Sequence, residues 1–166
     1  GKIMAISQDR IDLQFSTKTV AKSMSKPTTL GEWRLKRIAR YLRRRPKLVQ
    51  VFALTALPEV VVAWVDSDWA GEHGSRRSTS GGLVGLGECC IKSWSKTQAG
   101  GTLSSAEAEY HAMVLGAQEA LMVQSLLAEL GINVAVRLCT DSSAAKQAAE
   151  KVGSLRQKNM QLRYMF

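Results

Sequence analysis

The stretch VVVAWVDSDWAGEHGSRRSTSGGLVGLGECCIKSWS, residues 60–95, decides the fold. It opens on a run of mostly β-branched residues, which predicts a strand that ends on Asp66. A polar, turn-rich segment then separates this strand from two further strand-like stretches that a tight turn joins. The three predicted strands cover residues 60–65, 81–87 and 89–95. We therefore expect a three-strand antiparallel meander.

Helices and strands alternate after the meander. The longest helical pattern has Ser104 or Ser105 available as its N-cap and Gly131 as its stop. The expected elements are a helix over 104–130, a strand over 134–140, a helix over 142–151 and, over 154–166, a loop leading into a last helix. This order predicts an α/β domain whose mixed sheet adds parallel strands to the meander and is flanked by helices.

The net positive charge lies before the meander. Residues 1–58 hold 13 Lys or Arg and three acids, a net charge of +10, whereas residues 59–166 carry −1. We therefore divide the chain into a basic segment, 1–58, and an α/β domain, 59–166. Within the basic segment we expect a short helix over 11–24 and a possible strand over 48–52.

The centre of the basic segment is WRLKRIARYLRRRPK, residues 33–47. Apolar side chains recur there at steps of three and four residues between basic ones, which predicts a basic amphipathic helix. Thr28 or Thr29 can cap the helix and Pro46 can stop it. Such a helix suits the phosphates of a nucleic acid. The alternative is an ordinary solvated helix face.

Composition excludes several classes of protein. With 166 residues and 45% hydrophobic content the chain can bury a core without disulfides, and its longest apolar stretch is too short to cross a bilayer. Cys89, Cys90 and Cys139 lack metal-site spacing, so we expect free, buried thiols. The start has no secretory signal and no initiator methionine, which indicates an intracellular segment of a longer protein, cytoplasmic or nuclear.

Three carboxylates are candidates for chemistry. Asp66 and Asp141 each end a predicted strand, where α/β sheets usually build their sites, and Glu109 lies on the flank of the long helix that can lean over the sheet edge. Oxygen ligands without a His or Cys cluster favour magnesium, the usual metal of phosphoryl chemistry. Together with the basic helix, this pattern points to nucleic-acid phosphodiesters. The alternative is that these acids are caps or surface charges.

Five motifs stand in order along the second part of the chain. They are DSDWAG (66–71), RRSTSGG (76–82), KSWSKTQ (92–98), LSSAEAEY (103–110) and TDSSAA (140–145). In order and spacing they closely resemble the ribonuclease H domain of copia-type LTR retrotransposon Pol polyproteins. Upstream, SQDRIDLQFSTK (7–18), MSKPT (24–28) and LKRIARYL (35–42) resemble the segment that joins reverse transcriptase to ribonuclease H in these polyproteins.

The resemblance implies a ribonuclease H-like fold that cleaves the RNA strand of RNA:DNA hybrids, in one polyprotein with reverse transcriptase. It implies two Mg²⁺ ions, with Mn²⁺ able to substitute, on Asp66, Glu109 and Asp141. Asn159 and Gln161 stand where the family usually has a histidine and a fourth acid, so Gln161 is a doubtful fourth ligand and the C-terminal helix is cut short. The alternative is a catalytically weak or inactive module that binds hybrids or supports reverse transcriptase.

Other polar and aromatic residues receive secondary roles. The predicted nucleic-acid contacts are Arg76, Arg77, Ser78 and Thr79 in the loop after the first strand, and Arg37, Arg40, Arg43 and Arg44 on the basic helix. We expect Trp64 and Trp94 in the core. Trp69 is expected to pack in the core as well, the alternative being a contact with a sugar. Asp68 is expected to form a turn, and His73 and His111 are expected to be non-catalytic.

Overall fold

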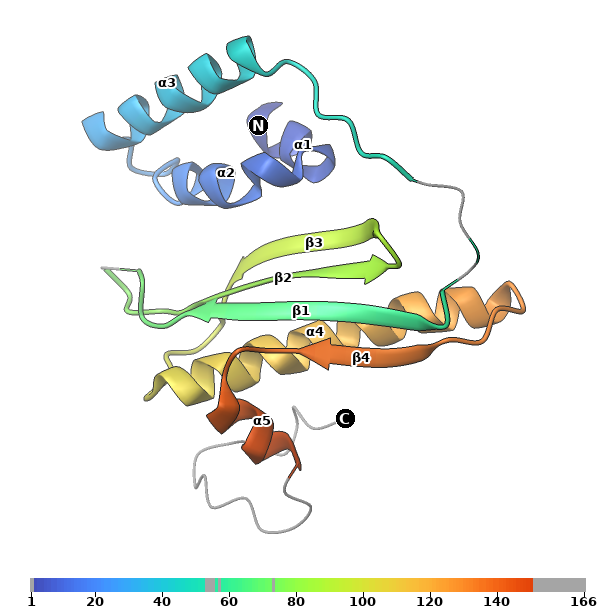
Figure 1. Cartoon of the computed structure of the whole chain (residues 1–166). Coiled ribbons are helices and arrows are strands. Elements are labelled where there is room, and N and C mark those ends of the chain that lie inside the picture. Colours follow the sequence, from blue (N-terminus) through green and yellow to red (C-terminus); the bar gives the residue numbers. More distant parts are fainter. Residues whose placement is uncertain (1, 53–55, 57, 73, 151–166) are drawn as a thin grey trace. The chain divides into compact units, whose positions relative to one another are not determined.

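The computed structural model describes residues 2–52, 56, 58–72 and 74–150, and the predicted helix within 154–166 lies outside them (Figure 1). The chain divides into two compact units, Gly1–Val51 and Phe52–Phe166. The sequence-based division at residue 58 lies a few residues further along the chain.

The first unit is helical. It consists of α1 (Lys2–Asp9), a short 3₁₀ helix η1 (Ile11–Leu13), α2 (Gln14–Ala21) and α3 (Thr29–Arg44). The helix predicted over 11–24 is therefore η1 followed by α2, and α1 was not predicted. The predicted strand over 48–52 was wrong. These residues are exposed and pair with no strand in the described part of the chain, so their backbone lacks the partner that a strand needs.

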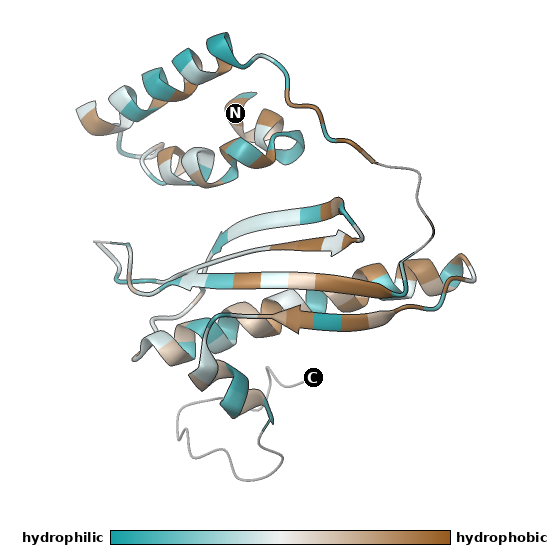
Figure 2. Ribbon diagram, viewed as in Figure 1, coloured by the Kyte–Doolittle hydropathy of each residue, from teal (hydrophilic) through white to brown (hydrophobic). Residues whose placement is uncertain are grey.

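The basic helix α3 begins and ends close to the predicted residues. The Thr28 Oγ1 atom accepts a hydrogen bond from the Gly31 backbone N–H at 3.0 Å, so Thr28 is the N-cap. The helix ends at Arg44, because Pro46 disfavours helical geometry in the residue before it. Only Gly31 and Ile38 of this helix are buried, and Figure 2 shows its hydrophilic colour along most of its length.

A buried arginine ties the first unit together. The Arg10 guanidinium donates to both oxygens of Asp12, at 2.9 and 2.8 Å, and also to the carbonyl of Pro46 at 3.3 Å. The Tyr41 hydroxyl donates to the same Asp12 carboxylate at 2.7 Å. Hydrogen bonds from Arg10 hold the pKa of Asp12 below its ordinary value. This network links η1 to α3, and nothing in the sequence pattern singled it out.

The second unit is the expected mixed α/β domain. It consists of β1 (Val60–Asp68), β2 (Thr79–Leu86), β3 (Cys89–Thr97), α4 (Ser105–Glu129), β4 (Ala135–Cys139) and α5 (Ser143–Glu150). The strand order is β3-β2-β1-β4, in which β1–β2 and β2–β3 are antiparallel and β1–β4 is parallel. The predicted meander, the long helix and the parallel addition are confirmed.

One face of the sheet packs on α4 and forms the core. Val61, Ala63 and Val65 of β1 are buried on this face, and Gly116 lets the helix approach so closely that a Cβ there would lie 2.2 Å from a Val65 methyl. Trp94 is 6% exposed, as predicted. Trp64 is 42% exposed, so its placement in the core was wrong. The reason is the strand period of two, which turns Trp64 to the opposite face from its buried neighbours.

The cysteines are free, but they are only partly buried, which corrects the expectation of buried thiols. They lie at partly buried positions of β3 and β4. Among the described residues no helix is both long enough and apolar enough to cross a membrane.

The core face also holds a buried carboxylate. Glu119 of α4 is 8% exposed and forms ion pairs with Lys92 and Lys96 of β3, the latter at 3.1 Å. Burial raises the pKa of Glu119, but the hydrogen bonds from the two lysines outweigh it, so the pKa lies below its ordinary value. The ion pairs therefore fasten the edge strand β3 to α4.

We expect Glu119→Gln to lower the free energy of unfolding by about 2 kcal/mol at neutral pH, because two ammonium groups lose their carboxylate. The Glu119 carboxyl has a lower pKa in the folded chain than in the unfolded chain, where a Glu has a pKa of about 4.3. Its ionised form therefore stabilises the fold above that pH, and this stabilisation is lost as the pH falls through the folded pKa. The difference between parent and variant should therefore shrink toward about pH 3 in urea-unfolding measurements. Glu129→Gln, at an exposed position of the same helix, is the control. A difference that does not change with pH would contradict this account.

Candidate metal centre

The parallel pairing of β1 with β4 brings two acids to one edge of the sheet. Trp64 of β1 is in register with Cys139 of β4, and Asp66 and Asp141 each follow two residues later. Because the two strands run in the same direction, both acids lie at the same end. β1 continues to Asp68 through pairing with β2, so Asp66 lies within the strand rather than at its end. This corrects the predicted end of the strand.

The second turn of α4 supplies the third acid. Ser104 caps the helix by accepting from the Glu107 backbone N–H at 3.1 Å, and a Glu107 oxygen accepts from the Leu103 N–H at 2.7 Å. Glu107 is therefore a capping residue. Glu109 lies two residues further along and faces β1, where the Ser67 hydroxyl donates to its Oε1 atom at 2.7 Å. Sequence reasoning missed Ser67, whose only signal was its position between two acids.

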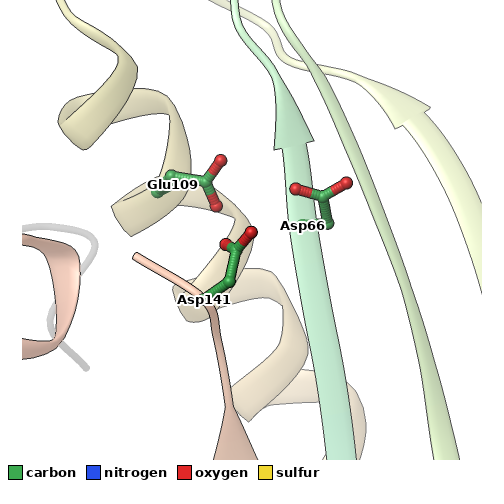
Figure 3. A group of neighbouring side chains, drawn as sticks. All are labelled: Asp66, Glu109 and Asp141. Carbon is green, nitrogen blue, oxygen red and sulfur yellow. The ribbon is translucent and has the colours of Figure 1, made fainter. Parts of the chain in front are cut away.

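Asp66, Glu109 and Asp141 converge. Each offers a carboxylate oxygen, and these oxygens all lie within 4.8 Å of one another. Figure 3 shows the three side chains gathered from β1, α4 and the residue stretch after β4. Asp66 and Asp141 are exposed and Glu109 is half-buried. The two exposed aspartates therefore leave this group of three acids accessible to a ligand from solvent, and α4, which carries Glu109, covers its other side.

The electrostatics of this cluster favour a bound cation. Burial and the charges of Asp66 and Asp141 raise the pKa of Glu109, against the lowering effect of its hydrogen bonds with Ser67. The Glu109 Oε2 atom is buried and has no hydrogen-bond partner among the described residues. A positive ion would satisfy this oxygen and relieve the repulsion. All the donors are carboxylate oxygens, so the site fits a hard divalent cation such as Mg²⁺.

The loop between β1 and β2 carries four predicted nucleic-acid contacts. Arg76 and Arg77 are exposed there, and their side chains can reach a ligand. Ser78 is 0% exposed, its Oγ accepting from the Ala70 N–H at 3.0 Å and lying 2.8 Å from the Thr102 hydroxyl. Thr79 is buried as well. The structure does not support the predicted phosphate contacts of these two hydroxyls, because Ser78 is buried by its contacts in the loop and Thr79 is buried as the first residue of β2.

The remaining candidates lie on the first unit, on other positions of the second unit, or outside the described residues. The arginines predicted on the basic helix, Arg37, Arg40, Arg43 and Arg44, are all exposed on α3 of the first unit. Asp68 lies against Gly71, where a Cβ would come within 1.9 Å of its carboxylate. His111 is half-buried on α4. Gln161, Asn159 and His73 lie outside the described residues.

Several known proteins are similar to this chain. The "Retrovirus-related Pol polyprotein from transposon RE1" of Arabidopsis thaliana is 32% identical over 169 residues, and the RE2 polyprotein of the same plant is 34% identical over 170. Each match covers 100% of this chain. Its homologues are retrovirus-related Pol polyproteins from transposons.

The chain spans 12% of the length of each of these two polyproteins. The chain is also 37% identical over 112 residues to the "Secreted RxLR effector protein 161" of Plasmopara viticola. The aligned region covers 68% of this chain and 78% of that protein. No family model matches the chain, and neither does any solved structure.

We expect Glu109→Gln to raise the melting temperature of the metal-free chain by on the order of 3 °C at neutral pH. A raised folded pKa means that stability is lost as the pH rises from the unfolded pKa through the folded one, and the neutral amide avoids this loss. Glutamine keeps an oxygen that can accept from Ser67. Thermal unfolding with and without Mg²⁺ measures the effect, and Mg²⁺ should stabilise the parent more than the variant.

Glu107→Gln is the matched control, two residues away on the same helix. This variant should lower the melting temperature, because the negative charge of Glu107 stabilises the helix N-terminus and its carboxylate accepts a hydrogen bond from the Leu103 N–H. If both variants shift the melting temperature in the same direction, the repulsion among the three acids is not the cause.

Proposed function

We propose that this segment of a transposon Pol polyprotein is a magnesium-dependent endonuclease that cleaves the RNA strand of RNA:DNA hybrids. The single observation that supports this most is the convergence of Asp66, Glu109 and Asp141 within 4.8 Å at the edge of the sheet. The ribonuclease H resemblance of the motifs around these three acids supports the same reaction.

The roles of the three acids follow from their positions. Asp66 and Asp141, which are exposed, and the half-buried Glu109 would each offer a carboxylate oxygen to divalent cations. Bound divalent ions supply a hydroxide nucleophile and charge stabilisation for an in-line displacement at phosphorus. Two Mg²⁺ ions are proposed, with Mn²⁺ able to substitute. Ser67 orients Glu109 by donating two hydrogen bonds to its Oε1 atom.

The substrate is held mainly through its backbone. Arg76 and Arg77 are exposed in the loop that follows β1 and present guanidinium forks to phosphate oxygens. A hybrid duplex has A-like geometry, which hides the major-groove edges and leaves phosphates and sugar hydroxyls for contact. The basic helix α3 adds a sequence-independent attraction, and reverse transcriptase of the same polyprotein is the proposed partner that supplies hybrids.

We expect Asp66→Asn to reduce hybrid cleavage by about a hundredfold or more in Mg²⁺, because the exposed side of the cation site loses a charge. Asp68→Asn is the matched control, two residues further along β1 and outside the trio, and should keep nearly full activity. Cleavage of an end-labelled RNA:DNA hybrid, compared with the DNA duplex of the same sequence, measures both. A parent chain that cuts no faster than Asp66→Asn contradicts the nuclease.

A second candidate is a module that binds hybrids without cutting them. Gln161 at the position of the usual fourth acid favours it, because a neutral amide holds a second cation less well than a carboxylate. In this case the affinity comes from basic groups and survives loss of the acids. If the Asp66→Asn variant still binds hybrid and the parent chain does not cleave it, this second candidate is supported.

We expect charge reversal at Arg43, Arg44 and Arg45 to weaken hybrid binding by about tenfold or more at low salt and to flatten its dependence on salt. The cause is the loss of phosphate contacts by the exposed end of α3. Fluorescence anisotropy over a salt series measures both quantities. Reversal of Lys146 on the other unit is less informative, because Lys146 pairs with Glu150. Lys2→Glu, at an exposed position of the first unit, is the single-charge control. Unchanged affinity would instead indicate that α3 contacts protein.

A further inference from the structure

The loop that follows the acid-bearing strand β1 presents a tryptophan to solvent. Trp69 is 46% exposed, so the expected core packing was wrong. Its indole N–H donates to the Thr102 carbonyl at 3.3 Å, in the segment that leads into α4. The ring therefore lies between the end of β1 and the start of α4, the two elements that supply Asp66 and Glu109.

Buried hydrogen bonds fix this loop in place. Ala70, the residue after Trp69, is 8% exposed and has a φ of 52°, so the chain reverses there. Its backbone N–H donates to the Ser78 hydroxyl, which also lies 2.8 Å from the Thr102 hydroxyl. Ser78 thus joins the residue after Trp69 to Thr102, whose carbonyl accepts from the indole. A large aromatic ring that is held rigidly yet left half in water is preorganised for a ligand, since little conformational entropy remains to be lost on binding.

The chemistry of the exposed ring limits what it can contact. The indole N–H, its one polar group, is already used within the protein, so the ring offers solvent only an apolar, π-bearing surface. The bases of a duplex are stacked on one another and their faces are covered, whereas the sugars line the grooves. Arg76 and Arg77 in the same loop are exposed and suited to the phosphates on either side of such a sugar.

We propose that Trp69 is a substrate-positioning residue whose ring packs against a sugar of the hybrid next to the scissile phosphate, an inference that rests on the proposed function. It contributes affinity through apolar contact, while Arg76 and Arg77 contribute it through charge. The two contributions differ in their dependence on salt, because only phosphate contacts release counterions.

The test is hybrid binding by the full 166-residue chain without divalent ions, so that no cleavage occurs. Trp69→Ala should weaken binding by about tenfold with an unchanged salt slope, and Trp69→Phe should weaken it less because a ring remains. Arg76→Ala with Arg77→Ala should lower the slope. The matched control is Trp64→Ala, which removes an equally exposed indole from the open face of the sheet, and it should bind within about twofold of the parent.

A measurement on the parent chain avoids any effect of substitution on folding. Hydroxyl-radical footprinting should show Trp69 protected from oxidation by bound hybrid and Trp64 as reactive as in the free chain. Equal oxidation of Trp69 in the free and bound states, or Trp69→Ala binding that matches the parent, overturns the inference. If the chain cleaves hybrid but Trp69 is oxidised equally with and without it, only the inference about Trp69 is overturned. If bound hybrid protects Trp69 from oxidation but the chain cleaves nothing, only the proposed nuclease activity is overturned.

Discussion

The site depends on the parallel pairing of β1 with β4. The register of Trp64 with Cys139 places Asp66 and Asp141 at the same level, although 74 residues lie between them along the chain. The chain between the two acids makes this pairing possible. The other strands of the meander pair with the other edge of β1, and α4 crosses the sheet so that β4 pairs with β1 in the same direction. A slip of one residue would turn the acids to opposite faces of the sheet.

Close packing under the sheet holds the repelling acids in place. Three carboxylates at one point destabilise the metal-free fold, yet Glu109 cannot turn away, because its helix packs on Val61, Ala63 and Val65 and because Ser67 holds one of its oxygens. The Glu119 ion pairs with Lys92 and Lys96 fasten the far side of the same helix to β3. The hydrophobic core and these ion pairs thus hold three mutually repelling carboxylates together.

Much of the fold could be predicted because local signals agreed with one another. Alternation and turns gave the meander, Ser104 and Gly131 bounded α4, and Thr28 bounded α3. The errors arose where a local sequence pattern was compatible with both a buried and an exposed side chain. Hydrophobicity placed Trp64 and Trp69 inside, whereas strand parity and a chain reversal at Ala70 leave both exposed. Hydroxyls beside two arginines suggested phosphate contacts, whereas Ser78 and Thr79 are folded inward.

By itself, the sequence determined the order of helices and strands in the α/β domain, the division of charge between the two parts of the chain, and the residue types able to hold a hard cation. These follow from periodicity, capping and donor chemistry, which are local. Tertiary structure alone decided that the three acids meet, that Ser67 orients one of them, and which side chains of the β1–β2 loop face outward. Those facts depend on strand register and on contacts between residues distant in sequence, which no local pattern encodes.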